Sequence, residues 1–365
     1  MSDALLKLGL RLRQRRAEAG VDVDPLAHKA GVPAAAIKAF EAGGGGLGLS
    51  ALGRLATALG VDAAAFVHTD AYEEAAPPEP AVLLSKASNA SLSPEDVRRL
   101  TTAVFHARSF CQLAPILGLE VLSSRFKPMA PRKPAHRGGY ALANRVRHEL
   151  DAPHGPLYNL KRTIEDRFNI LVLELPFDNA AIQGAACRSG TARVIALNRN
   201  LREVTARFVA GHELCHHLAD LKEYEATTDS DGGESDGFNL DPSAKEQRAK
   251  AFAAMLLAPS GSVQELLGPP RADGAGLDGA RKIISRARAH FGMSFASMAW
   301  HLFALKYLGS DDDIVRTLIE KADGQDVTGF ETEQAEDGLS RRLRSAQEHD
   351  AISAARAREL TSHHI

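Results

Sequence analysis

Two histidines and a glutamate in one short run have the spacing of a metal site. The sequence reads His-Glu-Leu-Cys-His at positions 212 to 216, inside a run, residues 206–218, whose composition suits a helix. Positions i and i+4 of a helix lie on one face, one turn apart. The imidazoles of His212 and His216 can therefore bind one Zn²⁺, and Glu213 beside them can act as a general base. The pattern predicts hydrolytic zinc chemistry.

A catalytic zinc needs a third protein ligand and keeps a fourth position open for water. Residues 244–259 supply a candidate, because apolar residues recur there at helical spacing and Pro259 ends the predicted helix. Glu246 lies at the start of this helix. An isolated Glu on a helix is usually solvated, but the histidine pair one loop upstream favours Glu246 as the third ligand.

A short strand is predicted just before the histidine run. Residues 192–198 are β-branched and apolar, and the strand ends at Asn198. Two interpretations stay open. The strand could lie at an exposed sheet edge, where unpaired N–H and C=O groups align an extended peptide, or it could be an ordinary core strand.

These residues together resemble a known family. Residues 205–218, residues 246–259, the preceding strand with Asn198, and residues 291–302 are similar to the ImmA/IrrE family of zinc metallopeptidases, over about Tyr140 to Leu308. The resemblance implies a gluzincin-like site in which His212, His216 and Glu246 hold Zn²⁺ and Glu213 is the base. It also implies a role in cleaving or otherwise inactivating a DNA-bound repressor.

One position departs from the family pattern. Lys250 stands one turn after Glu246, where the family usually has Asn. An Asn there can orient a metal ligand by hydrogen bonding. Lys has three donors, no acceptor and a positive charge, so Zn²⁺ would repel it. Either Lys250 points away from the metal or the site is weakened. We keep Lys250 and Asn198 as candidate neighbours of the ligand shell.

The composition of the chain limits its class. Its 365 residues allow two or three domains, and 44% hydrophobic residues suit a globular core. A formal net charge of −2 argues against a polybasic nucleic-acid binder. The three cysteines form no spaced framework, no signal peptide precedes the first domain, and no apolar run is long enough to span a membrane. We expect a cytoplasmic protein in which Cys215 is a buried core residue.

The N-terminal residues form a second recognisable pattern. Short helices are predicted from the apolar spacing, with Asp22 as an N-cap and a turn at Gly31. Residues 8–67 resemble a helix-turn-helix of the Cro/repressor (XRE) type. In such domains the second helix of the motif, here residues 33–42, enters the major groove.

The predicted recognition helix is poor in base-reading side chains. Alanine occupies its outer face at positions 34, 35, 36 and 39, and alanine makes no hydrogen bond to a base. Lys38 is its polar reader, Val23 replaces the usual phosphate-contacting Gln, and the first helix offers basic candidates for phosphates, namely Arg11, Arg13, Arg15 and Arg16. Eight Lys and Arg against six Asp and Glu in residues 1–67 leave only +2. DNA binding and a docking or dimerising role both stay open.

The predicted fold class is α+β, mainly α with a small β-sheet. It includes a zincin-like peptidase domain. The predicted parts are a helix-turn-helix (1–68), a linker (69–92), a connecting helix (93–120), a Pro-rich basic linker (121–138), the metallopeptidase domain (139–309) and a C-terminal helical extension (310–365). The connecting helix could pack on the first domain or pair with its copy in a homodimer, but we expect it to pack internally. The acidic stretch 220–241 is interpreted as a mobile loop rather than a calcium site.

Two functions of different class fit these observations. The first is a zinc endopeptidase that cleaves a repressor-type protein, with Tyr158 or His301 as oxyanion-stabilising candidates by residue type alone. The second is a non-catalytic XRE-type regulator whose zinc domain senses or holds a partner. Glu213 separates them, because an enzyme needs that carboxylate and a structural zinc site needs only the ligands.

Overall fold

The structure is a computed structural model that describes most of the chain, in segments. The described residues are 3–18, 21–44, 46–59, 81–86, 92–127, 134–221, 244–270, 276–322, 327–331, 337–349, 351–354, 357 and 360. The chain splits into two compact units. One unit combines Met1–Pro77 with Arg342–Ile365, and the other is Pro78–Arg341. The predicted acidic loop falls almost wholly outside the described residues.

The N-terminal helices form the predicted helix-turn-helix. They are α1 (Asp3–Glu18), α2 (Val23–Ala30), α3 (Ala34–Glu41) and α4 (Leu49–Leu59). Leu12, Leu26, Ile37, Phe40 and Leu55 are almost fully buried between them. Gly31 ends α2 in the left-handed conformation, with φ 61°, which an L side chain rarely adopts, so the turn before α3 suits glycine.

The larger unit contains a four-stranded sheet. Its strands are β1 (Ala81–Lys86), β2 (Leu171–Leu175), β3 (Ile182–Ser189) and β4 (Ala192–Asn198), in the order β1-β3-β4-β2. Strand β3 is antiparallel to both β1 and β4, and β2 is parallel to β4. The predicted strand 192–198 is confirmed, but the edge interpretation is wrong. Strand β4 is paired on both sides and buried along nearly its whole length, so it is a core strand.

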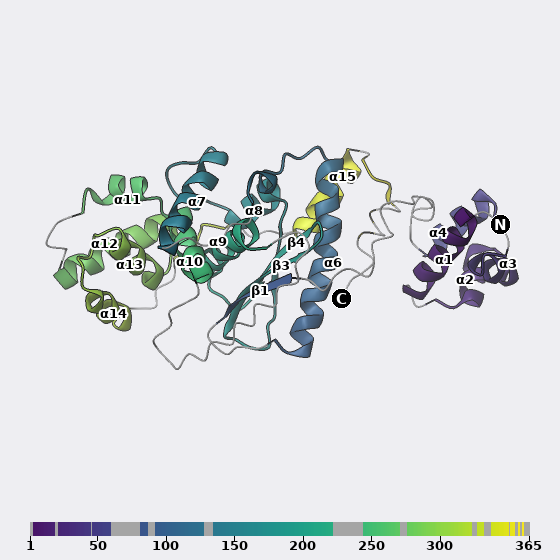
Figure 1. The fold of residues 1–365 in the computed structure, drawn as a ribbon, viewed down its shortest axis with the longest axis horizontal. Coiled ribbons are helices and arrows are strands. Elements are labelled where there is room, and N and C mark those ends of the chain that lie inside the picture. Colours follow the sequence, from purple (N-terminus) through teal and green to yellow (C-terminus); the bar gives the residue numbers. More distant parts are fainter. Residues whose placement is uncertain are drawn as a thin grey trace. The chain divides into compact units, whose positions relative to one another are not determined.

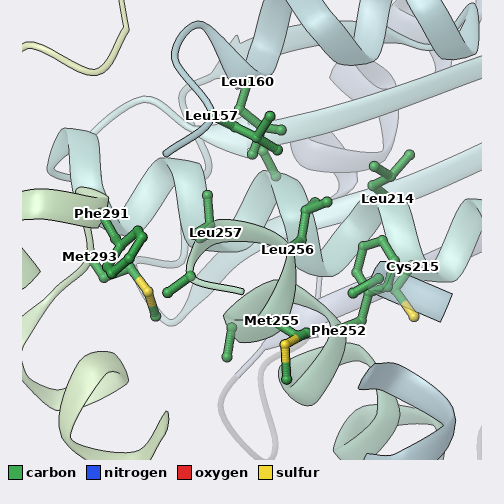
Figure 2. Packing of buried hydrophobic residues seen from close by; sticks show 14 of the residues in the cluster. Leu157, Leu160, Leu214, Cys215, Phe252, Met255, Leu256, Leu257, Phe291 and Met293 are labelled. Atoms are coloured by element: carbon green, nitrogen blue, oxygen red, sulfur yellow. The ribbon is translucent and has the colours of Figure 1, made fainter. Parts of the chain in front are cut away.

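Helices cover this sheet and position the metal-binding residues. Helix α6 (Pro94–Ile116) and helix α9 (Glu203–Ala219) both pack on β4, and α9 also packs on β3 (Figure 1). Helix α10 (Ala244–Leu257) packs between α9 and α7 (Ala135–Glu149). Leu214 and Cys215 of α9 meet Phe252 and Leu256 of α10 in the main hydrophobic core (Figure 2). Cys215 is fully buried, as the sequence predicts.

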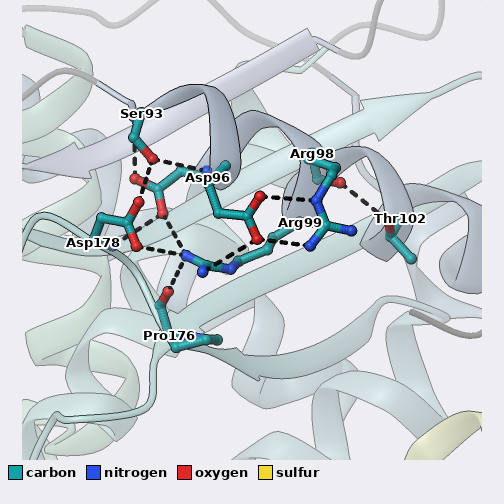
Figure 3. A network of polar contacts seen from close by, with 8 residues as sticks. Ser93, Asp96, Arg98, Arg99, Thr102, Pro176 and Asp178 are labelled. Carbon is teal, nitrogen blue, oxygen red and sulfur yellow. Dashed lines mark hydrogen bonds and ion pairs between the residues drawn. The ribbon is translucent and has the colours of Figure 1, made fainter.

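The start of α6 is fixed by a polar network (Figure 3). Ser93 and Asp96 form a capping box, in which each side chain accepts a hydrogen bond from the other residue's backbone N–H. Arg99 donates to the carbonyl of Pro176 at 2.6 Å and to Asp178 at 2.8 Å, and the Ser93 hydroxyl donates to Asp178 at 2.6 Å. The network ties α6 to the segment after β2. The connecting helix therefore packs internally, on the sheet of its own domain.

Both predicted linkers contain ordered parts of the peptidase unit. Strand β1 lies within the predicted linker 69–92 and pairs with β3, about 100 residues further along the chain. The predicted linker 121–138 contains a 3₁₀ turn, η1 (Leu122–Arg125), and the first turn of α7. Leu122 and Phe126 are buried in the main core, so these residues belong to the domain. Neither ordered segment could be predicted from the sequence, because prolines, glycines and cations surround their short apolar stretches.

Further helices lie on either side of the two ligand helices in the sequence. Helix α8 (Leu160–Phe168) precedes them, and α11 (Ser260–Leu267), α12 (Gly276–Phe291), α13 (Phe295–Ala304), α14 (Asp312–Glu320) and α15 (Gly338–Glu348) come after. Helix α15 ends at Glu348, and residues 351–352 form a bend. No helix among the described residues is long and apolar enough to cross a membrane.

The predicted C-terminal extension also contributes to the peptidase unit. Glu331 accepts backbone N–H groups from the start of α8, at 3.0 Å from Leu160 and 3.3 Å from Lys161, and pairs with the buried Arg207 of α9 at 2.8 Å. The ring of Phe330 lies under the Arg207 guanidinium, 4.9 Å from its carbon to the ring centroid. Residues 327–331 therefore help to fix the helix that carries the two histidines.

Candidate metal centre

Helix α9 places the two histidines side by side. The rings of His212 and His216 have centroids 4.8 Å apart, and their Nε2 atoms are 3.1 Å apart. Their side chains are only 3% and 2% exposed. Gly211, next to His212, faces α10, where a Cβ would make an ordinary contact of 3.5 Å with Ala253. The i, i+4 spacing thus gives two imidazole nitrogens aimed at one point.

Helix α10 brings Glu246 to the same point. Its Oε2 lies 3.2 Å from Nε2 of His212, and its Oε1 lies 3.1 Å from Nε2 of His216. The ligand atoms of the three residues all lie within 4.8 Å of one another. Two imidazoles and one carboxylate are a donor set that suits Zn²⁺. Glu246 is 32% exposed, so solvent reaches the group from its side.

The position of α10 depends on a close contact with α7. Gly139 of α7 lies against the backbone of α10, where a Cβ would stand 2.3 Å from the carbonyl oxygen of Arg248 and 2.9 Å from the amide nitrogen of Phe252. Any side chain at Gly139 would push the two helices apart. Because Glu246 lies less than a turn before Arg248, this contact helps to set where its carboxylate reaches.

Asp220 fixes the orientation of one ligand, although the sequence does not single it out. Nδ1 of His216 donates to Oδ2 of Asp220 at 2.8 Å, and Arg248 of α10 donates to the other carboxylate oxygen. Asp220 and Arg248 are each 1% exposed. A carboxylate on the far nitrogen of a ligating His fixes its ring and tautomer. Asp220 follows His216 by four residues, so the helical spacing is the available signal, but the acidic loop that begins there masks it.

The electrostatics of the group follow from these contacts. Burial lowers the pKa of His216, but hydrogen bonds with Asp220 and Glu246 outweigh it and raise the pKa to about 10. Burial raises the pKa of Glu246, but its hydrogen bonds with His212 and His216 lower it well below the usual range. Burial lowers the pKa of His212. Asp220 and Glu246 thus favour positive charge at His216, and the same contacts would favour a metal cation there.

Glu213 lies between α9 and the sheet. It is fully buried, and a Cβ built on Gly184 of β3 would stand 3.3 Å from its Oε1 and 2.6 Å from a methyl carbon of Val209. Its charge also raises the pKa of the Cys187 thiol, after the larger effect of burial. The carboxylate is therefore fixed between the histidines on its own helix and the backbone of β3, where it can serve chemistry at the same centre.

The two candidate neighbours of the ligand shell have different positions. The Lys250 side chain is exposed. Its charge still lowers the pKa of His212, as the smallest of the causes. Asn198 is buried, but its amide donates to the carbonyl of Ile182 at 2.9 Å and accepts the N–H of Asn200 at 3.0 Å. Asn198 therefore ends the strand and orders the following turn.

The two oxyanion candidates have different surroundings. The ring of Tyr158 is 58% exposed and stacks on Phe330, with centroids 5.4 Å apart. His301 is buried, its Nε2 donates to the carbonyl of Ala258 at 2.8 Å, and burial lowers its pKa to about 4. A neutral His301 with its proton on Nε2 has no second N–H for an oxyanion. His301 is therefore a core residue and does not fit the oxyanion role.

The DNA-binding candidates also separate in the structure. Arg16 makes a two-pronged contact with the buried Glu41, at 2.8 and 2.9 Å, and donates to the carbonyl of Val21. Its guanidinium holds α1 to α3, so Arg16 is engaged inside the domain. Arg13 is exposed, and Arg11 and Arg15 are half-buried on the same helix. Lys38 of α3 is 61% exposed and lies 3.7 Å from Asp24.

The fold and its donor set define a metallopeptidase-like domain behind a helix-turn-helix. Comparison with known families agrees. Residues 165–302 match the IrrE N-terminal-like domain of the Peptidase M78 family, and residues 7–68 match a helix-turn-helix domain. The first match includes all four residues of the metal centre, and the second covers most of α1 and all of α2 to α4. The chain thus contains an IrrE-type domain of the Peptidase M78 family after an N-terminal helix-turn-helix domain. No curated protein and no solved structure matches it.

Proposed function

We propose that the chain is a zinc-dependent endopeptidase that acts on a regulatory protein, in the first place a DNA-bound repressor. The observation that supports this proposal is the convergence of His212, His216 and Glu246, with the carboxylate of Glu213 buried beside them. Structural zinc sites are usually closed by four protein ligands, whereas three ligands leave room for water. The three-residue group therefore favours a catalytic role.

The residues of the site divide the work of peptide hydrolysis. Zn²⁺ held by His212, His216 and Glu246 would lower the pKa of a bound water and polarise the substrate carbonyl. Glu213 takes the proton from the attacking water and passes it to the amine that leaves. Asp220 holds the His216 ring in place during these steps. The carboxylate of Glu213 lies beside Gly184 of β3, where a Cβ would stand 3.3 Å from its Oε1.

The identity of the substrate class rests on the ImmA/IrrE resemblance and on the helix-turn-helix. A protein that carries its own DNA-binding type of domain can meet a repressor on the same DNA, which raises the local concentration of the substrate. In this proposal the N-terminal domain binds DNA near the repressor, and the larger unit hydrolyses the peptide bond. Exposed cations such as Arg13 on α1 and Lys38 on α3 are the expected DNA contacts.

The decisive experiment replaces Glu213 by Gln in the full chain. Glu213 is not a ligand, so the variant should retain about one zinc per chain by metal analysis. Cleavage of a library of internally quenched peptides should fall by roughly 10²–10⁴-fold. Glu265→Gln is the matched control, because Glu265 lies on α11 and is 68% exposed. A double His212→Ala, His216→Ala variant should lose the zinc.

The alternative is a non-catalytic regulator in which the zinc unit holds a partner. The helix-turn-helix match is the observation that supports it. The two functions differ in one result. If Glu213→Gln retains every effect of the wild type on repressor and on transcription while the ligand variant abolishes them, the metal site serves binding alone and the endopeptidase proposal fails.

A further inference from the structure

Strand β3 passes directly beside the general base. Its Gly184 has no side chain, and a Cβ there would stand 2.6 Å from Val209 and 3.3 Å from Oε1 of Glu213. Helix α9 packs on β3 and on β4, and its contacts with β3 are the more extensive. The backbone of β3 is thus the part of the sheet that lies closest to the proposed catalytic carboxylate. A peptide aligned along β3 would run past the metal centre.

The edge of β3 that faces away from β4 is covered by the chain itself. Strand β1 pairs with it antiparallel, from Ala81 opposite Arg188 to Lys86 opposite Ile182. Ser85 lies opposite Gly184, and the register shifts between Ser85 and Lys86. The irregular step in β1 therefore falls at the level of Glu213. Among the described strands, the remaining sheet edges are the outer sides of β1 and of β2, and β2 is separated from β3 by β4.

An endopeptidase needs its substrate extended, and main-chain pairing with a strand edge supplies that alignment. Such an edge gives affinity through backbone hydrogen bonds, so it accepts many sequences. In this chain the edge nearest the metal centre is already paired. A substrate can use it only after residues 81–86 leave.

We propose that the edge of β3 beside Glu213 is the docking edge for an extended peptide, and that Ala81–Lys86 occupies it as an intramolecular competitor. This inference deepens the proposed function and rests on it. The occupant reads Ala-Val-Leu-Leu-Ser-Lys. The corresponding substrate class is an apolar stretch of about this length that turns polar near the metal centre, bound antiparallel to β3 in the same register.

Strand β1 is well placed to act as a competitor because the chain is anchored just after it. Ser93 begins α6 and donates to Asp178 at 2.6 Å, so only residues 87–92 separate the strand from a fixed point. A short tether gives an effective concentration on the order of millimolar. A free peptide with an intrinsic Kd on the order of 100 µM would then bind about tenfold more weakly than to an open edge.

The test measures binding, independently of cleavage. The probe is a fluorescein-labelled peptide of residues 80–87, titrated against the full chain by fluorescence anisotropy. A Val82→Pro, Leu83→Pro double variant removes two consecutive backbone N–H groups, one of which faces β3 in any register. It should bind the probe at least tenfold more tightly than wild type. The matched control, Val82→Thr with Leu83→Thr, keeps both N–H groups and should bind as wild type does. Equal affinity in all three proteins overturns the proposal.

A second variant decides the matter if the proline variant fails to fold. Val82 and Cys187 are Cα partners across β1 and β3, so Val82→Cys can form a disulfide that locks β1 in place. Oxidised Val82→Cys should bind the probe at least tenfold more weakly, and reduction should restore binding. Leu83→Cys, opposite Ala186, is the control that cannot form this bridge. Unchanged binding in the oxidised, bridged protein overturns the proposal.

The outcomes also separate this inference from the proposed function. All titrations are repeated with Glu213→Gln, in which cleavage is removed and the edge is kept. Probe binding that responds to the β1 variants, without cleavage in any protein, leaves the docking edge standing and removes the endopeptidase. If wild type cleaves its substrate and probe binding does not respond to the β1 variants, the endopeptidase proposal stands and the docking edge is removed.

Discussion

Asp220 accepts a hydrogen bond from Nδ1 of His216 at 2.8 Å, while Nε2 of the same ring points at Glu246 from 3.1 Å. Asp220 therefore fixes the imidazole ring through Nδ1, and Nε2 is the nitrogen that would bind the proposed metal. Both nitrogens have defined partners, so the tautomer that presents a lone pair to a cation is fixed. Arg248 completes the arrangement by pairing with the other oxygen of Asp220.

Replacing Asp220 by Asn should weaken zinc binding by about 10- to 100-fold, since partners of ligating histidines typically contribute that much. Competition with a chromogenic chelator measures the change. The zinc-free variant should also unfold more easily, because Arg248 would be left buried with a neutral partner, and breaking a buried pair costs about 3–5 kcal/mol. Asp278→Asn, on the exposed first turn of α12, is the control. Unaltered zinc affinity in Asp220→Asn would mean that the His216 ring is fixed by packing alone.

The metal ligands could be predicted from the sequence because their geometry is local. Two histidines four residues apart share a helix face in any helix, and Glu246 opens the next predicted helix along the chain. Asp220 obeys the same four-residue rule from His216, but it adjoins an acidic, glycine-rich stretch and resembles part of it. Its role becomes visible only when Arg248, from another helix, is seen on its other oxygen.

The sheet was harder to predict because its pairing is not local. Strand β1 is a short apolar run in a proline-containing segment, and its partner β3 follows about 100 residues later. Strand β3 contains Gly184, Ala185 and Ala186, which are weak strand formers by propensity. Burial between helices and neighbouring strands, rather than propensity, holds these residues in the sheet.

Lys250 should have little effect on zinc, because its side chain is exposed. Its charge lies close enough to disfavour a cation at His212, so removing it should tighten zinc binding by no more than a few-fold, and less at high salt. Lys250→Asn and Lys250→Ala should behave alike in chelator competition. A gain that appears with Asn and is absent with Ala would show instead that an amide at this position bonds to a ligand.

Binding of the chain to DNA should be weak and salt-sensitive, because α3 offers alanines to the bases. Replacing Arg13 and Arg15 by Ala should lower affinity for every sequence alike and flatten the salt dependence, by about 0.9 in log–log slope for each phosphate that is no longer neutralised. Anisotropy titrations of unrelated duplexes at several salt concentrations measure this. Tight, sequence-selective binding at physiological salt would contradict the prediction.

Arg16 should behave differently from the other cations of α1. Its two bonds to Glu41 join α1 to α3, so Arg16→Ala should lower the thermal stability of the N-terminal unit. Arg13→Ala should leave that stability unchanged, since Arg13 is exposed. Calorimetry of the full chain can compare the two variants. Equal melting profiles would show that the pairing of Arg16 with Glu41 contributes nothing measurable in solution.

His301 should make the larger unit less stable in mild acid. It is buried and neutral, donates to Ala258, and has a pKa lowered by burial to about 4, against about 6.5 when unfolded. Between these values the unfolded chain binds a proton that the folded chain does not, so stability falls as the pH drops through that window. From pH 7 to pH 5 the decrease due to this residue is about 2 kcal/mol.

His301→Gln keeps an N–H that can reach the carbonyl of Ala258 but cannot take up the proton. Denaturant unfolding at both pH values should show the stability of wild type falling by about 2 kcal/mol more than that of this variant. Parallel decreases would mean that His301 is protonated in the folded protein.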